Sequence, residues 1–140
     1  MSLHGNRFFT MWYGVLDPVS GRLVYSSAGH PPALVIDPNA TARRLTTKGI
    51  AVGCVASTTY ENLECCLETG DILYLFSDGA YEVRGSDGHF ISWEAFENLL
   101  TTKHQSPADS LDVIVSELGR IAGDSGFADD VSMMEIRRLE

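Results

Sequence analysis

Residues 67–84 read LETGDILYLFSDGAYEVR, and the middle of this stretch decides the fold. The continuous apolar run ILYLF at residues 72–76 predicts a central strand that is buried on both faces. Asp78 and Gly79 come just after it. A carboxylate there is held by a rigid element but lies at the edge of the sheet, and the glycine lets the backbone turn sharply and a ligand approach closely. Asp78 is therefore a candidate site residue.

Antiparallel strands are predicted on the N-terminal side of this run. Residues 8–16 (FFTMWYGVL) and 23–27 (LVYSS) are rich in aromatic and β-branched side chains. The sequence DPVSG between them carries the Asp, Pro and Gly that favour a turn, so the two strands predict a hairpin. Shorter strands are expected at residues 33–36, 43–45 and 60–67.

The last third of the chain predicts two helices and a strand. Apolar residues at helical spacing follow the candidate cap Ser92 and indicate a helix over residues 93–103. A second amphipathic helix is expected between the candidate cap Ser106 and Gly123, which would end it. Residues 131–137 predict a final strand.

The order of these elements indicates the fold class. Several antiparallel strands, two helices and one last strand do not show the regular alternation of a doubly wound parallel sheet. We expect an α+β fold in which an antiparallel layered sheet carries helices on its outer faces. At 140 residues, of which 44% are hydrophobic, the chain suits one domain over residues 1–140.

Charge and cysteine content disfavour other classes of protein. A net charge of -9 repels nucleic-acid backbones and anionic membrane surfaces, so neither partner is expected. The odd count of cysteines, three, argues against a disulfide framework and favours reduced thiols in the cytoplasm. The sequence has neither a signal-peptide pattern at its start nor an apolar run long enough to cross a bilayer.

A second acidic motif, ADDV at residues 128–131, precedes the last predicted strand. Adjacent acids such as Asp129 and Asp130 repel each other and are tolerated in solvent or beside a cation. Hard cations such as Mg²⁺ and Mn²⁺ prefer oxygen ligands, and carboxylates from two strand ends could converge on one. Ser-Asp-Gly and Asp-Asp are also ordinary loop sequences, so from spacing alone the alternative to a metal site stays open.

Four motifs in order give a more specific indication. They are FxTMxYGxLDPxxGxLxYSSAGHPPALxI from residue 8, GIAVG at residues 49–53, LETGDILYLFSDGAYEVR at residues 67–84, and ADDVSMMEIR at residues 128–137. Together they resemble the SpoIIE/RsbU-like branch of the PPM-type serine/threonine phosphatases over nearly the whole chain.

This resemblance implies a β-sandwich flanked by helices and a role for particular residues. Family members hydrolyse phosphoserine or phosphothreonine with two Mn²⁺ or Mg²⁺ ions and a bridging water, without a catalytic nucleophile from the protein. It implies that Asp78 and Asp129 are metal ligands and that Gly79 supplies the turn. For Asp130 it leaves two roles open, orienting a ligand or a bound water, or binding the metal itself. For His30, in the AGHPP segment, we expect an organising hydrogen bond in its loop, with metal ligation or acid catalysis as the alternatives.

The chain departs from the family pattern at its N-terminus. The family's earlier strands carry a metal-bridging aspartate and a GDVxGHG-like segment, and here the early residues offer only His4-Gly5. Two carboxylates without the bridging one should bind a metal weakly. We therefore expect a partial phosphatase domain that is weakly active or inactive by itself, from a parent protein that is active. Sheet edges left uncovered in this way could be covered by a homodimer or by a rearranged sheet.

Three functions remain in competition. The first is a phosphatase acting on a phosphorylated regulatory protein of the anti-sigma-factor antagonist type in bacterial stress or sporulation signalling. The second is a binding module that has the phosphatase fold but has lost catalysis. The third is an unrelated metal-dependent hydrolase that uses the same acids, which leaves the similarity outside the acidic motifs unexplained.

Overall fold

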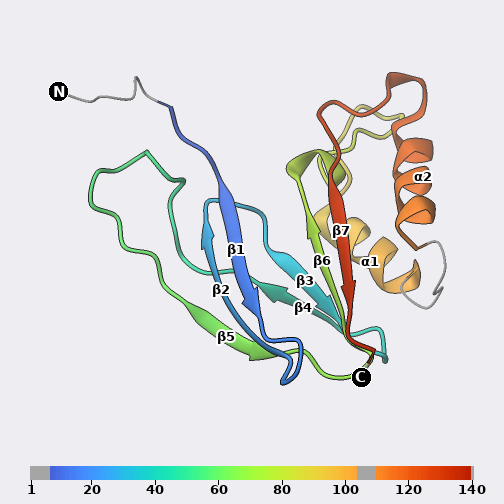
Figure 1. Cartoon of the computed structure of the whole chain (residues 1–140). Coiled ribbons are helices and arrows are strands. Elements are labelled where there is room, and N and C mark those ends of the chain that lie inside the picture. Colours follow the sequence, from blue (N-terminus) through green and yellow to red (C-terminus); the bar gives the residue numbers. More distant parts are fainter. Residues whose placement is uncertain (1–6, 104–109, 140) are drawn as a thin grey trace.

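Figure 1 shows the structure, a computed structural model that describes residues 7–103 and 110–139. The described strands form two antiparallel sheets. One has the order β1-β2-β5, with the bounds Met11–Leu16 (β1), Arg22–Ala28 (β2) and Leu63–Cys66 (β5). The other has the order β4-β3-β6-β7, with the bounds Ala33–Ile36 (β3), Ala42–Leu45 (β4), Ile72–Phe76 (β6) and Met133–Arg137 (β7). The helices are η1 (Asp78–Ala80), α1 (Trp93–Lys103), α2 (Ser110–Ala122) and η2 (Gly123–Ser125).

The two sheets pack on each other through an apolar layer. Leu23 and Tyr25 of β2 are buried against Val35 of β3 and Leu73 of β6. Trp12 of β1 stacks on Tyr25 with ring centroids 5.7 Å apart. The sheets diverge toward the end at which β6 stops and β7 begins, at the top of Figure 1.

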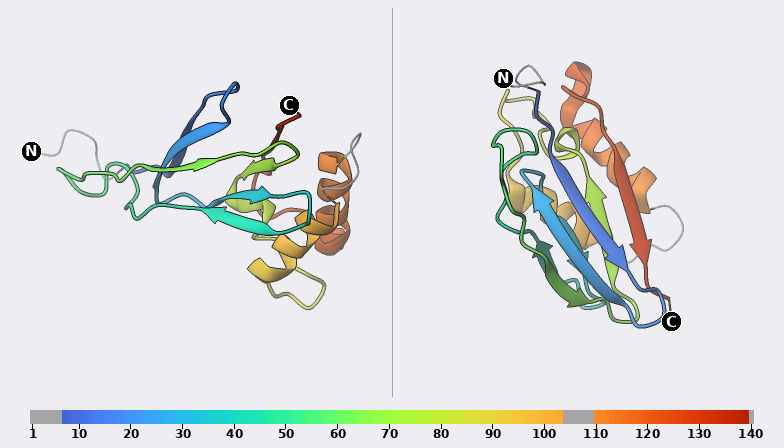
Figure 2. Two further views of the ribbon diagram at one scale, coloured as in Figure 1. Left: turned by 90° about the horizontal axis from the view of Figure 1, so that it is seen from below. Right: turned by 60° about the vertical axis from the view of Figure 1, so that its left-hand side comes forward.

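The two α-helices, α1 and α2, cover the outer face of the four-stranded sheet (Figures 1 and 2). Side chains along a strand alternate between its faces, so Ile72, Tyr74 and Phe76 meet the helices while Leu73 faces the other sheet. Phe96 of α1 is fully buried against this face. The apolar run of β6 is therefore covered on both sides, as its sequence predicts.

The three-stranded sheet carries no helix on its outer face among the residues that the structure describes. Alternate residues of β1 are exposed there: Met11 is 42%, Tyr13 59% and Val15 55% exposed. The predicted α+β sandwich is confirmed, and within the described chain its helices lie on one of the two outer faces.

The first strand is shorter than predicted. Residues 33–36 and 72–76 form strands as expected, but β1 starts at Met11 instead of residue 8. The ladder with β2 begins at the Met11↔Ala28 pair, and Phe9 forms only an isolated bridge to Val52.

The predicted strands at 60–67 and 131–137 are also shorter in the structure. The ladder between β5 and β2 extends only from Leu63 to Cys66, and β7 starts at Met133, where it pairs with Phe76. Strand β2 continues to Ala28, but beyond Tyr25 it forms no ladder with the residues before Leu63, and Ser26 Oγ instead donates to the Glu61 carbonyl at 2.8 Å. The three cysteines are free, as expected.

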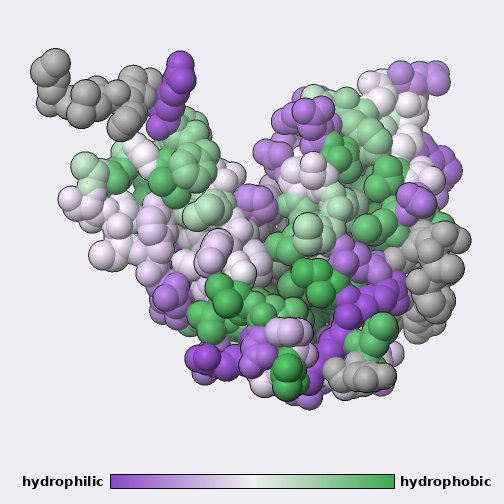
Figure 3. Space-filling model, viewed as in Figure 1, coloured by the Kyte–Doolittle hydropathy of each residue, from purple (hydrophilic) through white to green (hydrophobic). Residues whose placement is uncertain are grey.

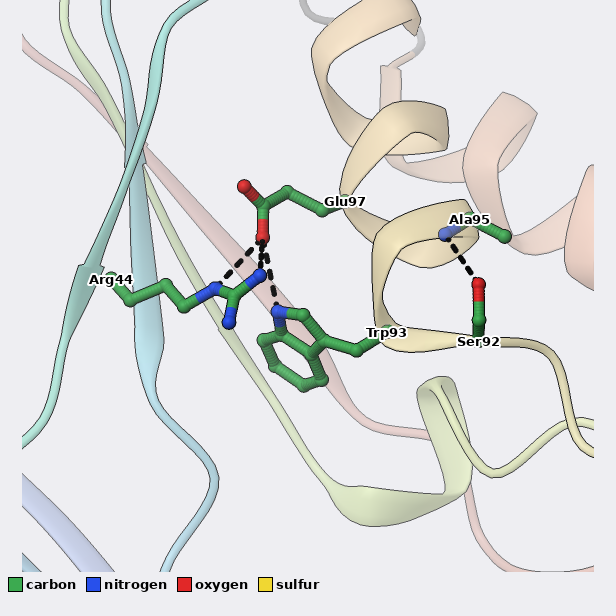
Figure 4. A network of polar contacts seen from close by, with 5 residues as sticks. All are labelled: Arg44, Ser92, Trp93, Ala95 and Glu97. Carbon is green, nitrogen blue, oxygen red and sulfur yellow. Dashed lines mark hydrogen bonds and ion pairs between the residues drawn. The ribbon is translucent and has the colours of Figure 1, made fainter.

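The helix predictions hold where the structure describes them. The Ala95 N–H donates to Ser92 Oγ at 3.0 Å, so Ser92 caps α1 as predicted (Figure 4). Gly123, with a φ of 57°, directly follows the last residue of α2. The predicted cap Ser106 lies outside the described residues.

Candidate metal centre

Asp78 lies at the end of the buried strand β6, where η1 begins. Its carboxylate is exposed, and Oδ1 accepts the Gly79 N–H at 3.0 Å. The Asp78 carbonyl oxygen accepts the N–H groups of Tyr81 and Glu82 at 3.0 and 2.8 Å, which closes the turn. The backbone of Asp78 is thus fixed while its carboxylate remains open to a ligand.

Asp129 and Asp130 lie just before β7 and are both exposed. Asp129 Oδ1 accepts the Asp130 N–H at 2.7 Å. Because β6 and β7 are antiparallel and Phe76 pairs with Met133, the chain leaving β6 lies beside the chain entering β7. The sheet therefore brings together two acidic motifs that are far apart in the sequence.

Gly79 determines how closely these two segments approach. It is buried, and a Cβ built on it would lie 2.5 Å from the Asp130 carbonyl oxygen and 3.2 Å from the Asp129 carbonyl carbon. Real Cβ atoms essentially never lie within 3.0 Å of another heavy atom. Gly79 does not adopt a positive φ. It is needed for close approach, and the group that approaches is the protein's own backbone at the second acidic motif.

Ser77 and Ser132 form hydrogen bonds that join the end of β6 to the chain entering β7. The Ser77 N–H donates to the Ser132 carbonyl at 2.9 Å, and the Ser132 N–H donates to Ser77 Oγ at 3.0 Å. Ser77 Oγ in turn donates to the Asp130 carbonyl at 2.9 Å. The sequence analysis missed both residues. The signal that could have indicated them is a small hydroxyl residue beside each acidic motif at a strand end.

Aromatic side chains pack together beside the turn that begins at Asp78. The Tyr81 ring lies edge-on to Trp93 at 5.2 Å and to Phe76 at 6.3 Å between centroids. Burial raises the pKa of Tyr81, and the negative charges of Glu82 and Asp78 raise it further. The turn is therefore packed directly on the helix-side core.

A polar network fixes Trp93 in this cluster (Figure 4). The Trp93 Nε1–H donates to Glu97 Oε2 at 3.0 Å. The same oxygen accepts hydrogen bonds from Arg44 Nε and Nη2 at 2.9 and 2.7 Å. The guanidinium carbon of Arg44 lies 5.3 Å from the centroid of the Trp93 ring. Arg44 thereby ties strand β4 to helix α1 and, through Trp93, to Tyr81.

His30 lies on the other side of the gap between the sheets, in the loop from β2 to β3. Its Nδ1 is 3.0 Å from the Pro31 carbonyl oxygen. His30 lines a groove of about 330 Å³ whose other wall includes Ser77 and Ser132, and Trp12 belongs to its lining. Figure 3 shows the surface hollowed between the two lobes at this end. Within the described part of the chain, His30 forms no hydrogen bond to Asp78 or Asp129.

The carboxylates at the strand ends are ligands of the kind that a hard divalent cation binds. Carboxylate oxygens on a rigid platform are the ligands that Mg²⁺ and Mn²⁺ prefer. Within residues 7–103 and 110–139, no cluster of three or more His, Cys, Asp or Glu side chains could hold a metal. Among the described residues, Asp78 and Asp129 could thus supply part of a coordination sphere.

The architecture defines the class of protein. The crystal structure of the RsbU and RsbW domains of Rv1364c from Mycobacterium tuberculosis matches with a TM-score of 0.71 at 29% sequence identity. The match covers 90% of this chain and 35% of that chain. This is the sandwich of PPM-type phosphatase domains.

The sequence model of the family Stage II sporulation protein E (SpoIIE) matches residues 1–139. The chain therefore belongs to the SpoIIE family, as its four motifs predict.

The chain is also similar in sequence to two curated proteins. Protein IcfG from Synechocystis sp. is 30% identical over 138 residues, covering 96% of this chain and 22% of the relative. Phosphoserine phosphatase RsbU from Bacillus subtilis is 27% identical over 138 residues, covering 98% of this chain and 41% of the relative. The chain therefore spans less than half the length of either. None of its described helices is long and apolar enough to cross a membrane.

Proposed function

We propose that this chain forms the part of a metal-dependent phosphoserine/phosphothreonine protein phosphatase that supplies Asp78 and Asp129 as metal ligands. The observation that carries the proposal is the contact of Gly79 with the Asp129–Asp130 backbone. It leaves no room for a side chain between the two segments and so sets both carboxylates on one edge of the sheet. The name of the relative RsbU, a phosphoserine phosphatase, supports the reaction class.

Each residue has a distinct part in this proposal. A divalent cation, Mn²⁺ or Mg²⁺, would supply the activation of water and the neutralisation of phosphoryl charge. Asp78 and Asp129 hold the ion, and Asp130, next to Asp129 and equally exposed, orients a ligand or water. Gly79 keeps the two segments at the required separation. His30 organises the loop on the opposite wall through its hydrogen bond to Pro31.

We further propose that residues 1–140 are one portion of a phosphatase domain and that the chain alone is weakly active or inactive. Two carboxylates are a sparse ligand set, and the described residues offer no cluster of three. The same observation favours a second candidate, a non-catalytic regulatory module with the phosphatase fold. Metal binding separates the two, because a module without catalysis has no need of Asp78 and Asp129 as ligands.

For the intact protein, we propose a cytoplasmic phosphatase that acts on a phosphorylated regulatory protein of the anti-sigma-factor antagonist type. Support comes from the structure of Rv1364c, in which an RsbU domain and an RsbW domain belong to one protein. We also propose a homodimer, because Met11, Tyr13 and Val15 form an exposed apolar row on the edge strand β1. Sedimentation over a range of concentrations would test the dimer, with Tyr13→Lys expected to weaken it.

The deciding experiment is a calorimetric Mn²⁺ titration of the 140-residue chain and of Asp78→Asn and Asp129→Asn, with hydrolysis of p-nitrophenyl phosphate measured in parallel. Both variants should lose Mn²⁺ binding while keeping the wild-type melting temperature, because both side chains are exposed. Asp124→Asn, which changes an exposed acid on η2, serves as the control for net charge. Unchanged Mn²⁺ affinity in the two variants would refute the assigned ligands.

A further inference from the structure

The groove between the two sheets contains polar groups that the metal site does not use. Its lining includes Trp12, His30, Ser77 and Ser132, together with apolar residues of β6 and β7. It opens at the end of the molecule where Asp78 and Asp129 are located, because Ser77 directly precedes Asp78. Its volume of about 330 Å³ is ample for a phosphorylated side chain.

Hydrogen bonds within the protein account for most of these polar groups. The Trp12 Nε1–H donates to the Leu45 carbonyl at 3.0 Å. Ser77 Oγ both donates, to Asp130, and accepts, from the Ser132 N–H. His30 Nδ1 is committed to the Pro31 carbonyl at 3.0 Å.

Two atoms of the lining remain without a partner in the described part of the chain, His30 Nε2 and Ser132 Oγ. His30 lies in the loop that leads from β2 to β3, and Ser132 lies just before β7. A carbonyl oxygen only accepts hydrogen bonds, so Nδ1 of His30 must carry a hydrogen, and Nε2 becomes a second donor when the ring is protonated. The serine hydroxyl donates or accepts as required.

The loop that presents His30 is held rigidly. The Gly29 N–H donates to the Gly49 carbonyl at 2.9 Å, and Ser27 Oγ donates to the His30 carbonyl at 3.2 Å. Gly29 has a φ of 67°, a conformation that favours glycine, and two prolines follow His30. A donor held in this way loses little conformational freedom when it binds a ligand.

The distribution of charge indicates what such a ligand would be. The exposed acids at the strand ends, Asp78, Asp129 and Asp130, suit a cation and repel an anion. An anion could therefore bind only between such a cation and a donor on the opposite wall. Among the side chains of the lining, His30 is the one that can carry a positive charge.

We propose that His30 Nε2 and Ser132 Oγ form a phosphate subsite that holds the phosphoryl group of a phosphomonoester against the metal at Asp78 and Asp129. This inference rests on the proposed function, since the ion neutralises the acids beside the subsite. It assigns His30 a direct contact with substrate in addition to its hydrogen bond within the loop.

Two substitutions of His30 separate contact with the ligand from organisation of the loop. His30→Asn keeps a nitrogen donor near the Nδ1 position, for the Pro31 carbonyl, and removes Nε2. His30→Gln keeps a donor near Nε2 and removes the one that bonds to Pro31. Ser132→Ala removes only the hydroxyl, and His89→Asn, at an exposed histidine in a turn, is the matched control.

The experiment is a titration of the 140-residue chain with inorganic phosphate at saturating Mg²⁺, followed by calorimetry and by NMR of the histidine ring nitrogens. Phosphate should shift the His30 ring signals saturably. It should bind about tenfold more weakly to His30→Asn, and more weakly to Ser132→Ala, as expected for the loss of a charge-assisted hydrogen bond. His89→Asn should match the wild type. His30→Gln should retain more phosphate affinity than His30→Asn but melt at a lower temperature.

Wild-type phosphate affinity in His30→Asn, or phosphate binding without a change in the His30 signals, would overturn the proposal. So would a failure of the wild type to bind phosphate once Mg²⁺ is bound. The metal is titrated first, without phosphate, on the wild type and on Asp78→Asn. Failure of the proposed metal site is thereby recognised independently of failure of the subsite.

Discussion

Ser77 and Ser132 join the end of β6 to the start of β7 through a main-chain hydrogen bond of 2.9 Å and a second bond, from the Ser132 N–H to Ser77 Oγ, of 3.0 Å. Ser77 Oγ also reaches the Asp130 carbonyl at 2.9 Å. The Ser77 hydroxyl therefore fixes the end of the second acidic motif, at Asp130 and Ser132, relative to the first. The position of the two carboxylates depends on this junction.

We expect Ser77→Ala to lower the free energy of unfolding by about 1 kcal/mol, the usual net value of such hydrogen bonds. It should also weaken Mn²⁺ binding severalfold, because the Asp130 segment is no longer fixed. The control is Ser26→Ala, which removes a hydroxyl that donates to the Glu61 carbonyl at 2.8 Å in the other sheet. Urea unfolding and calorimetry should show a loss of stability in both variants and a loss of Mn²⁺ affinity in Ser77→Ala alone.

Gly79→Ala should separate the two acidic motifs. The new Cβ would lie 2.5 Å from the Asp130 carbonyl oxygen, and a backbone atom cannot move away without shifting the loop. Overpacking of this kind costs about 1–3 kcal/mol. In the control, Gly119→Ala on α2, the added methyl lies 3.9 Å from Phe127, an ordinary contact, and alanine favours the helix. A Gly79→Ala protein with wild-type stability and wild-type Mn²⁺ affinity would contradict the role given to this glycine.

Asp130→Asn should weaken Mn²⁺ binding less than Asp129→Asn does. We propose Asp130 as a residue that orients a ligand or water, and removal of such partners typically costs about 10–100-fold in metal affinity. Calorimetry of the two single variants and the double variant measures the difference. If Asp130→Asn abolished binding and Asp129→Asn did not, the assignments of the two acids would have to be exchanged.

The network around Trp93 should stabilise the fold mainly through the indole. The side chains of Arg44 and Glu97 are 52% and 21% exposed, and such an ion pair contributes only about 0.2–1 kcal/mol. Trp93→Phe removes the N–H that donates to Glu97 and weakens the cation–π contact, which together should cost about 1–2 kcal/mol. Urea unfolding should therefore show a larger loss of stability for Trp93→Phe than for Glu97→Gln.

A matched control for the ion pair is Glu64→Gln. Glu64 pairs with Arg22 across β2 and β5, and both side chains are more than half exposed. Its loss should change the free energy of unfolding by less than about 0.5 kcal/mol. A larger effect for Glu64→Gln than for Trp93→Phe would contradict the importance assigned to the indole.

Stability should fall at alkaline pH partly because of Tyr25. Burial between the sheets raises the pKa of Tyr25 above its ordinary value of 10.0, the charge of Cys65 adds to the shift, and Arg43 opposes it. The folded state therefore keeps the phenol proton more firmly than the unfolded state does. The part of the free energy of unfolding that depends on the neutral phenol is fully present below pH 10. It is lost as the pH rises from there through the pKa of Tyr25 in the folded state.

Tyr25→Phe should accordingly lose less stability than the wild type between neutral pH and about pH 11. Tyr13→Phe, at a residue 59% exposed on the outer face of β1, should follow the wild type. Chemical unfolding at a series of pH values measures all three proteins. Parallel pH profiles for the wild type and Tyr25→Phe would contradict the predicted contribution.

The sequence by itself determined the elements and the family. The apolar run ILYLF predicts a strand covered on both faces, and β6 has the predicted bounds because side-chain alternation and burial agree along it. Ser92 and the apolar spacing after it likewise specify α1. These signals are local, so they can be read from neighbouring residues.

Only the tertiary structure decided how distant residues meet. The pairing of β6 with β7 places the Asp78 turn against the Asp129–Asp130 segment, and nothing in the sequence near Gly79 indicates that its close neighbour is the Asp130 carbonyl. In the same way, the packing of one sheet on the other puts His30 into the groove that Ser132 lines. Strand register and sheet packing depend on contacts across long stretches of chain, whose energies are set by the whole core and not by local sequence.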